Sequence, residues 1–218
     1  MNWLRAGVLG ANDGIVSVAA VVVGVAGATS ALPAVFTAGI AALVGGAISM
    51  ALGEFVSVSS QRDSERALID KERRELAEMP EQELEELSGL YQAQGLSAPT
   101  ARQVAIELTE HDALSAHLSA ELGIDQGQVV NPWHAALASA VAFTIGALLP
   151  MLTILLPATV RIPVTFVVVL LALAIAGYVA AWIGGSSRWR SALRVVVGGA
   201  VALGATFAIG AVLGTTVV

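Results

Sequence analysis

The stretch LGANDGIVSVAAVVV, Leu9–Val23, places a carboxylate, Asp13, inside a long apolar run. A second run, Ala34–Val58, contains Glu54, and the other long apolar runs contain no acidic residue. A charged side chain near the centre of a bilayer costs at least about 2.5–3.5 kcal/mol, so such residues usually face a bundle interior, a cavity or an ion path. The two carboxylates therefore predict transport.

The composition predicts an all-α membrane protein with five transmembrane helices. Of the 218 residues, 56% are apolar and 13% are charged, and the mean hydropathy is +0.77. These values exclude an ordinary soluble domain, and the absence of cysteine excludes disulfides and thiolate metal sites. Segments near the length of a spanning helix are about Leu4–Ala28, Pro33–Val58, Pro132–Leu156, Ile162–Ile183 and Ala192–Val218.

The basic residues of the connections predict the orientation. If five helices alternate across the bilayer, ten basic residues fall on one side and only Arg161 on the other. The positive-inside rule then places the N-terminus, the insertion after the second span and the loop between the fourth and fifth spans in the cytoplasm. The short chain, rich in Ala and Val and without a targeting extension, favours a bacterial inner membrane.

An acidic helical insertion interrupts the membrane segments. We expect spans in residues 1–61 and 132–218, and a cytoplasmic metal-binding domain in residues 62–131. Fifteen of the seventeen acidic residues lie between Asp63 and Asp125, with only five basic ones. Helix-forming residues, with Pro80 and Gly95 as breakers, predict three helices, over about 62–79, 81–94 and 97–122.

The core of this insertion is expected to be thin, so that it needs a partner copy, a metal ion or both to be rigid. Its expected members are Leu76, Leu84, Leu87, Leu90, Tyr91, Val104, Leu108, Leu114 and Leu118.

Carboxylates at helical spacing make the insertion a candidate metal site. Residues three or four apart share one face of a helix, where like charges repel unless a cation compensates. Carboxylates from several helices, with a histidine, match the bundle sites of divalent iron or manganese. The alternative is a solvated acidic face, partly neutralised by neighbouring basic residues. The candidates are Glu72, Glu75, Glu83, Glu86, Glu107, Glu110, His111, His117 and Glu121.

Depth along the helices brings the membrane carboxylates to a common level. Asp13 lies eight residues beyond Arg5, about 12 Å of helix, and Glu54 lies seven before Gln61, about 10 Å. Met50 is one turn deeper than Glu54. Two carboxylates and a thioether suit ferrous iron better than magnesium or calcium. The alternatives are that Met50 only packs and that Glu54 reaches the interface.

These motifs resemble the vacuolar iron transporter family along the whole chain. The matching stretches are GANDG at Gly10–Gly14, SMALGEFVS at Ser49–Ser57 and an acidic insertion that ends with ELGI at Glu121–Ile124. The resemblance implies a homodimeric, proton-coupled exporter of ferrous iron, with the ion path between protomers. Manganese, cobalt, nickel and zinc are further expected substrates. We expect neither an enzyme nor a nucleic-acid partner.

The resemblance also implies roles for individual residues. The family's path residues correspond to Asp13, Met50 and Glu54. Where plant members carry a methionine pair, this chain has His117 and Leu118, which makes His117 a candidate replacement ligand and leaves the metal preference of the insertion open. The family's cytoplasmic glutamates, which bind metal and stabilise the dimer, correspond to Glu72, Glu75, Glu83, Glu86 and Glu121.

The expected mechanism is alternating access, with metal and protons competing for Asp13 and Glu54. The insertion would concentrate metal beneath the path or gate it. Two other classes are a membrane-anchored ferritin-like storage protein or di-iron oxidase, and a metal sensor. The first is disfavoured because the insertion has no Glu-x-x-His pair, and the second leaves the membrane carboxylates unexplained.

Overall fold

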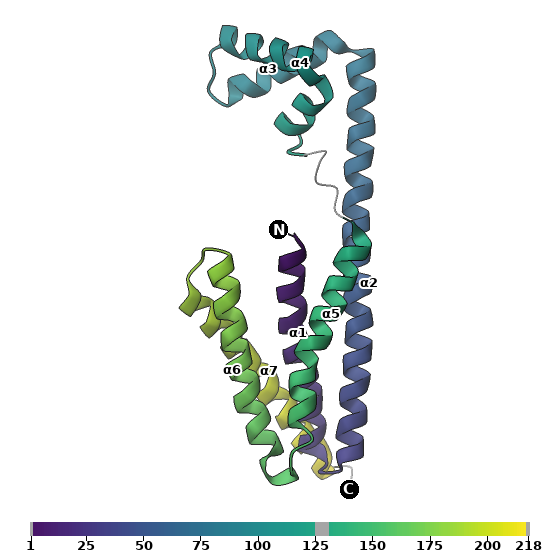
Figure 1. The fold of residues 1–218 in the computed structure, drawn as a ribbon, viewed down its shortest axis with the longest axis vertical. Coiled ribbons are helices and arrows are strands. Elements are labelled where there is room, and N and C mark those ends of the chain that lie inside the picture. Colours follow the sequence, from purple (N-terminus) through teal and green to yellow (C-terminus); the bar gives the residue numbers. More distant parts are fainter. Residues whose placement is uncertain (1, 125–130, 217–218) are drawn as a thin grey trace. The chain divides into compact units, whose positions relative to one another are not determined.

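The fold is all-helical. The computed structural model describes residues 2–124 and 131–216, and these contain seven helices and no strand (Figure 1). The predicted fold class is therefore confirmed as all-α. The helices are α1 Asn2–Ala28, α2 Leu32–Glu78, α3 Pro80–Ala93, α4 Ala98–Ala120, α5 Pro132–Thr153, α6 Ala158–Ile183 and α7 Arg188–Thr216.

Five of these helices, α1, α2, α5, α6 and α7, are long and apolar enough to cross a membrane. The five predicted spans are thus confirmed, and the chain is an integral membrane protein.

One helix, α2, replaces two that the sequence analysis separated. The sequence predicts the end of a span near Val58 and the start of a new helix at Arg62, whereas α2 is continuous over 47 residues. The intervening Ser59, Ser60 and Gln61 include neither glycine nor proline. Without a breaker, the backbone continues its hydrogen-bond ladder as the sequence changes from apolar to charged.

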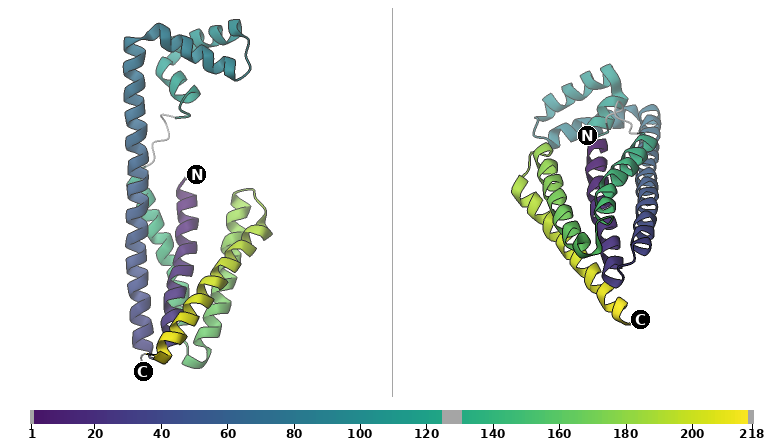
Figure 2. Two further views of the ribbon diagram at one scale, coloured as in Figure 1. Left: turned by 180° about the vertical axis from the view of Figure 1, so that it is seen from behind. Right: turned by 60° about the horizontal axis from the view of Figure 1, so that its bottom comes forward.

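Contacts divide the chain into two compact units: Met1–Val56 with Pro132–Val218, and Ser57–Asn131. In the first unit α1 is central, packed against α5, α7 and α6, while α6 runs beside α7 (Figures 1 and 2). Side chains of α1, α2 and α5 form one apolar cluster, and those of α1, α6 and α7 form another.

Glycines allow the close packing of α1. A Cβ on Gly14 would collide with the Phe143 carbonyl of α5, and one on Gly210 of α7 would collide with the Gly24 carbonyl. Small residues of this kind let membrane helices approach backbone to backbone.

The transmembrane part of α2 packs less extensively against the other helices of this unit than α1 does. It packs through Gly39 and Gly46, which lie against Met151 and Phe143 of α5. An apolar stripe on its other side is exposed. The stripe consists of Phe36, Ile40, Val44, Ile48, Leu52 and Val56.

A buried arginine joins two helix ends in this unit. Arg161 of α6 is 6% exposed, and its Nε and Nη1 donate to the carbonyls of Leu156 and Ser30 at 3.3 and 3.5 Å. These carbonyls follow α5 and α1, where backbone acceptors lack a partner within the helix. In the sequence, Arg161 bears only on the predicted orientation, and its role at the two helix ends is not predicted.

In the second unit, α3 packs against α4. Leu87, Ala105 and Ala116 form the buried core, and Leu84, Tyr91 and Leu108 pack against it. The small size of this core agrees with the expectation of a thin one.

The expectation of an unbroken third insertion helix is wrong. Asp112 has φ −163° and ψ 92°, which divides α4 into two helical segments.

The packing of α1 predicts a sharp difference between two glycines. Gly14→Ala should destabilise the protein by about 1–3 kcal/mol, the usual cost of overpacking, because the new methyl group meets backbone atoms that cannot turn aside. Gly204→Ala in α7 is the control, since nothing lies within 4 Å of its added Cβ. Thermal unfolding in detergent measures both. Equal midpoints for the two variants would contradict the close approach of α1 and α5.

Candidate metal centre

Three buried side chains from three helices form the candidate metal centre. Glu72 of α2, Glu83 of α3 and His117 of α4 are 3%, 5% and 0% exposed. His117 Nδ1 lies 3.0 Å from Glu72 Oε1 and 3.6 Å from Glu83 Oε2. One possible ligand atom from each residue lies within 4.8 Å of the others, and the described part of the chain contains no second such group of three.

The hydrogen-bonding of this group is incomplete. Within the described residues, His117 Nδ1 and Nε2 and Glu72 Oε1 have no hydrogen-bond partner, because the close contacts lack hydrogen-bond geometry. A buried polar atom without a partner costs about 1–3 kcal/mol. A divalent cation would satisfy these atoms together, so the residues present fit a metal site.

Electrostatics favour the same interpretation. Burial, and after it the negative charges of nearby glutamates with Glu121 foremost, raises the pKa of Glu72 from 4.5 to about 7. Burial also raises the pKa of Glu83, with a smaller contribution from Glu86. The pKa of His117 is lowered by burial. A neutral imidazole beside carboxylates that resist ionisation is a site where protons and a metal ion compete.

Local sequence explains how each ligand is placed. Pro80 occupies the first position of α3, which suits it because the missing N–H would have no partner there. This turn sets Glu83 one turn into α3, where its N–H donates to the Met79 carbonyl at 3.1 Å. Glu72 lies in the last turns of α2, before the same corner.

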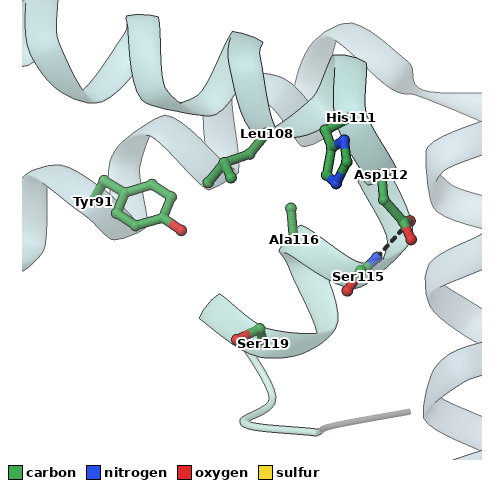
Figure 3. A pocket seen from close by; sticks show the side chains of 7 residues that line it. All are labelled: Tyr91, Leu108, His111, Asp112, Ser115, Ala116 and Ser119. Carbon is green, nitrogen blue, oxygen red and sulfur yellow. Dashed lines mark hydrogen bonds between the residues drawn. The ribbon is translucent and has the colours of Figure 1, made fainter. Parts of the chain in front are cut away.

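Asp112 positions the helical segment that carries His117, the third candidate ligand. Its Oδ1 accepts a hydrogen bond from the Ser115 N–H at 3.0 Å, which caps the short helical segment that carries His117 (Figure 3). An aspartate three residues before such an N–H is a common N-cap. Asp112 is not among the residues predicted from the sequence, although an aspartate inside a run of good helix formers is a signal for such a cap.

The break in α4 also opens a pocket of about 260 Å³. Figure 3 shows Tyr91 of α3 on one wall and His111 on another. His111 thus lines this pocket, whereas His117 lies in the buried group. The pocket lining is Tyr91, Leu108, His111, Asp112, Ser115, Ala116 and Ser119.

The remaining predicted ligands of the insertion lie outside the buried group. Glu75 forms an ion pair with Lys71 at 2.8 Å. Glu107, Glu110, Glu86 and Glu121 are exposed.

The exposed glutamates differ in whether their charge affects the buried group. Glu107 accepts a hydrogen bond from Gln103 at 2.9 Å, as expected of a solvated face. Glu86 and Glu121 act on the buried site through their charge, because both contribute to the raised pKa of Glu72. Partial loss of water around the Glu121 carboxylate and the charge of Glu86 also raise the pKa of Glu121.

The three predicted path residues lie in the first unit, Met1–Val56 with Pro132–Val218, which we call the membrane unit. Asp13 is exposed on α1, and its Oδ1 accepts a hydrogen bond from Ser17 at 2.6 Å. Met50 is half-buried and packs against the cluster that contains Phe143. Glu54 is half-buried one turn further along α2.

Five apolar spans and a buried group of two carboxylates and an imidazole in the helical insertion define an integral membrane protein with a candidate metal centre. The chain belongs to the VIT family, whose model matches residues 4–211. It is similar to a vacuolar iron transporter of Acanthamoeba castellanii, with 45% identity over 96% of this chain and 78% of that protein. The family is thus a family of metal-ion transporters, and the predicted resemblance is confirmed.

Plant relatives are more distant. Vacuolar iron transporter homolog 2.1 of Arabidopsis thaliana is 35% identical over 98% of this chain and 83% of its own length. Vacuolar iron transporter homolog 5 of Oryza sativa subsp. japonica is 36% identical over 94% of this chain and 78% of its own length.

The raised pKa of Glu72 predicts a pH effect on the metal-free protein. Between pH 4.5 and about 7, the folded state holds a proton on Glu72 that the unfolded chain has lost. The stability from this proton is therefore complete below pH 4.5 and is lost as the pH rises through about 7. Glu72→Gln cannot ionise, so at pH 8 the metal-free variant should protect its α3 and α4 amides from hydrogen exchange better than the wild type.

The difference should shrink as the pH falls through 4.5, because below that pH Glu72 becomes protonated in the unfolded chain as well as in the folded state. Glu85→Gln, at an exposed position of α3, is the control and should follow the wild type throughout. A constant difference between Glu72→Gln and wild type from pH 4.5 to 8 would contradict the raised pKa.

The cap at Asp112 predicts an effect on metal affinity without any change to a ligand. Asp112→Ala removes a contact typically worth about 0.5–2 kcal/mol, which frees the segment that carries His117. Calorimetric titration with manganese or zinc should show an affinity lowered roughly 2- to 30-fold. Asp112→Asn retains a capping oxygen and should bind as wild type does. If alanine and asparagine behave alike, the cap does not position His117.

Proposed function

We propose that this protein exports divalent transition-metal ions from the cytosol, with ferrous iron as the principal substrate and protons as counter-ions. The observation that carries the proposal is the buried group of Glu72, Glu83 and His117 in a chain of this family. Relatives named vacuolar iron transporters support iron in particular.

The ligand set supports a range of first-row metals. Carboxylates suit ferrous iron and manganese, and an imidazole extends the range to cobalt, nickel and zinc. Glu75, Glu86 and Glu121 would supply further oxygen ligands or negative charge around the site. In this proposal residues 62–131 act as the metal-binding domain.

Asp13, Met50 and Glu54 are proposed to form the transport site. Their chemistry offers two hard oxygens and one softer sulfur to an ion within the membrane unit. Asp13 supports this role most directly, because it is an exposed carboxylate on a membrane-spanning helix. A lipid-facing carboxylate is unfavourable, so its surroundings in the membrane must be water, an ion or protein.

A homodimer provides such surroundings. A second copy beside α1 and α2 would cover Asp13 and the exposed apolar stripe of α2, and it would place the ion path between protomers. The glycines that permit close approach within one protomer show that α1 already uses its other sides for α5 and α7.

Proton coupling follows from competition for carboxylates. Two nearby carboxylates in a dry site bind protons more readily than in water, and a divalent cation displaces those protons. Metal moving outward and protons moving inward would therefore use the same groups in alternation. The acidic domain would raise the local metal concentration at the cytosolic entrance.

The proposed orientation keeps the N-terminus and residues 62–131 in the cytosol, from the distribution of basic residues. The bacterial inner membrane stays a sequence-based prediction, and the relatives are named for the vacuole.

Transport by single variants tests the proposal. In inside-out vesicles, Asp13→Asn and Met50→Ala should each abolish most ferrous iron uptake and the accompanying proton flux, because each removes a path ligand. Glu85→Gln, an exposed change in the other unit, should transport normally. As a control for folding, cross-linking should show that each variant still forms dimers. Normal iron uptake by Asp13→Asn would remove the core of the mechanism.

A further inference from the structure

Three arginines at the start of α7 have no acidic counterpart. Arg188, Arg190 and Arg194 are exposed, and no Asp or Glu follows Asp125 in the sequence. Of the ion pairs between described residues, all lie within 62–117 and none includes these arginines. An anion from outside this part of the chain can therefore approach these arginines without displacing a described carboxylate.

Two of the arginines share one face of the helix. Arg190 and Arg194 are four residues apart, so their side chains lie one above the other, and like charges at this spacing destabilise a helix. An anion between them would reverse the sign of this interaction. Arg188 points elsewhere: its Nη1 donates to the Tyr178 hydroxyl at 3.5 Å, and its guanidinium lies 5.8 Å from the centre of that ring.

An apolar stripe continues from this pair along the same face. Val197 and Val201 are three and seven residues beyond Arg194, which places them below it on the helix surface. They are 53% and 66% exposed. A charged pair followed by an exposed apolar stripe on a spanning helix matches a phospholipid, with a polar head and acyl chains.

Aromatic residues mark the same end of the helix as the membrane interface. Trp182 and Trp189 flank the turn between α6 and α7 and are 61% and 75% exposed. Tryptophan concentrates at the level of the lipid headgroups. The guanidinium groups beside these rings are therefore at the depth of lipid phosphates.

We propose that Arg190 and Arg194 bind the phosphate of an anionic phospholipid whose acyl chains lie along Val197 and Val201. Guanidinium groups bind phosphate through paired N–H donors, which makes arginine well suited to this contact. A free phosphate ion would satisfy the arginines but would leave the apolar stripe without a role. The bound lipid supports α7, which packs against the central helix α1.

Lipid titration of the delipidated full-length protein in neutral detergent tests the proposal. Native mass spectrometry should show that phosphatidylglycerol binds about 30-fold more tightly than phosphatidylcholine, from the usual contribution of two basic residues to anionic lipid binding. In Arg190→Gln/Arg194→Gln this preference should fall to near unity. The matched control Arg66→Gln/Arg102→Gln, at two exposed positions of the other unit, should retain it.

Two further arms distinguish the lipid from a soluble anion. Val197→Ser/Val201→Ser should weaken phosphatidylglycerol binding while leaving binding of glycerol phosphate unchanged. Excess glycerol phosphate should compete poorly with the lipid in the wild type. Equal binding of both phospholipids, an unchanged preference in the arginine variant, or full competition by glycerol phosphate would each overturn the proposal.

Discussion

The contact of His117 with two buried carboxylates is the interaction around which the acidic unit of this protein, Ser57–Asn131, is organised. Nδ1 lies 3.0 Å from Glu72 and 3.6 Å from Glu83, with all three side chains removed from water. Such burial is unfavourable unless protons or a cation neutralise the carboxylates. The thin apolar core beside it contributes modest stability, so the ionic state of this group affects the whole unit.

The cost of burying polar groups is met differently in the membrane unit, Met1–Val56 with Pro132–Val218. There the helices are joined by close backbone contact, which needs no polar group, and α1 meets α5 and α7 through glycines. Asp13 lies on a face of α1 left open by this packing, where its carboxylate accepts a bond from Ser17. Rigid packing on one side and an accessible carboxylate on the other suit a helix that both anchors the bundle and handles an ion.

The two proposed sites would share a chemistry of competition between protons and metal. In the insertion, the raised pKa of Glu72 and the lowered pKa of His117 shift both residues toward their neutral forms when no metal is bound. Metal binding must then displace protons. In the proposed path, Asp13 and Glu54 would exchange the same two species. Carboxylates would thus serve both proposed sites, beside an imidazole in one and a thioether in the other.

The sequence by itself determined the five spans, because length and apolarity suffice for that prediction. It also determined that residues between the second and third spans are helical, and it identified Glu72, Glu83 and His117 among the metal candidates. The continuity of α2 was within reach of the same reasoning, since residues 59–61 contain no helix breaker. The change from apolar to charged composition marks the end of the predicted span, but such a change does not end a helix.

Only the tertiary structure decided which carboxylates come together. Helical spacing made Glu107 as good a candidate as Glu83, yet Glu107 is exposed and Glu83 is buried. The difference arises from the rotation of each helix against its neighbours and from the break at Asp112, which turns the end of α4 and buries His117. Spacing fixes which residues share a face, whereas packing decides which face is removed from water.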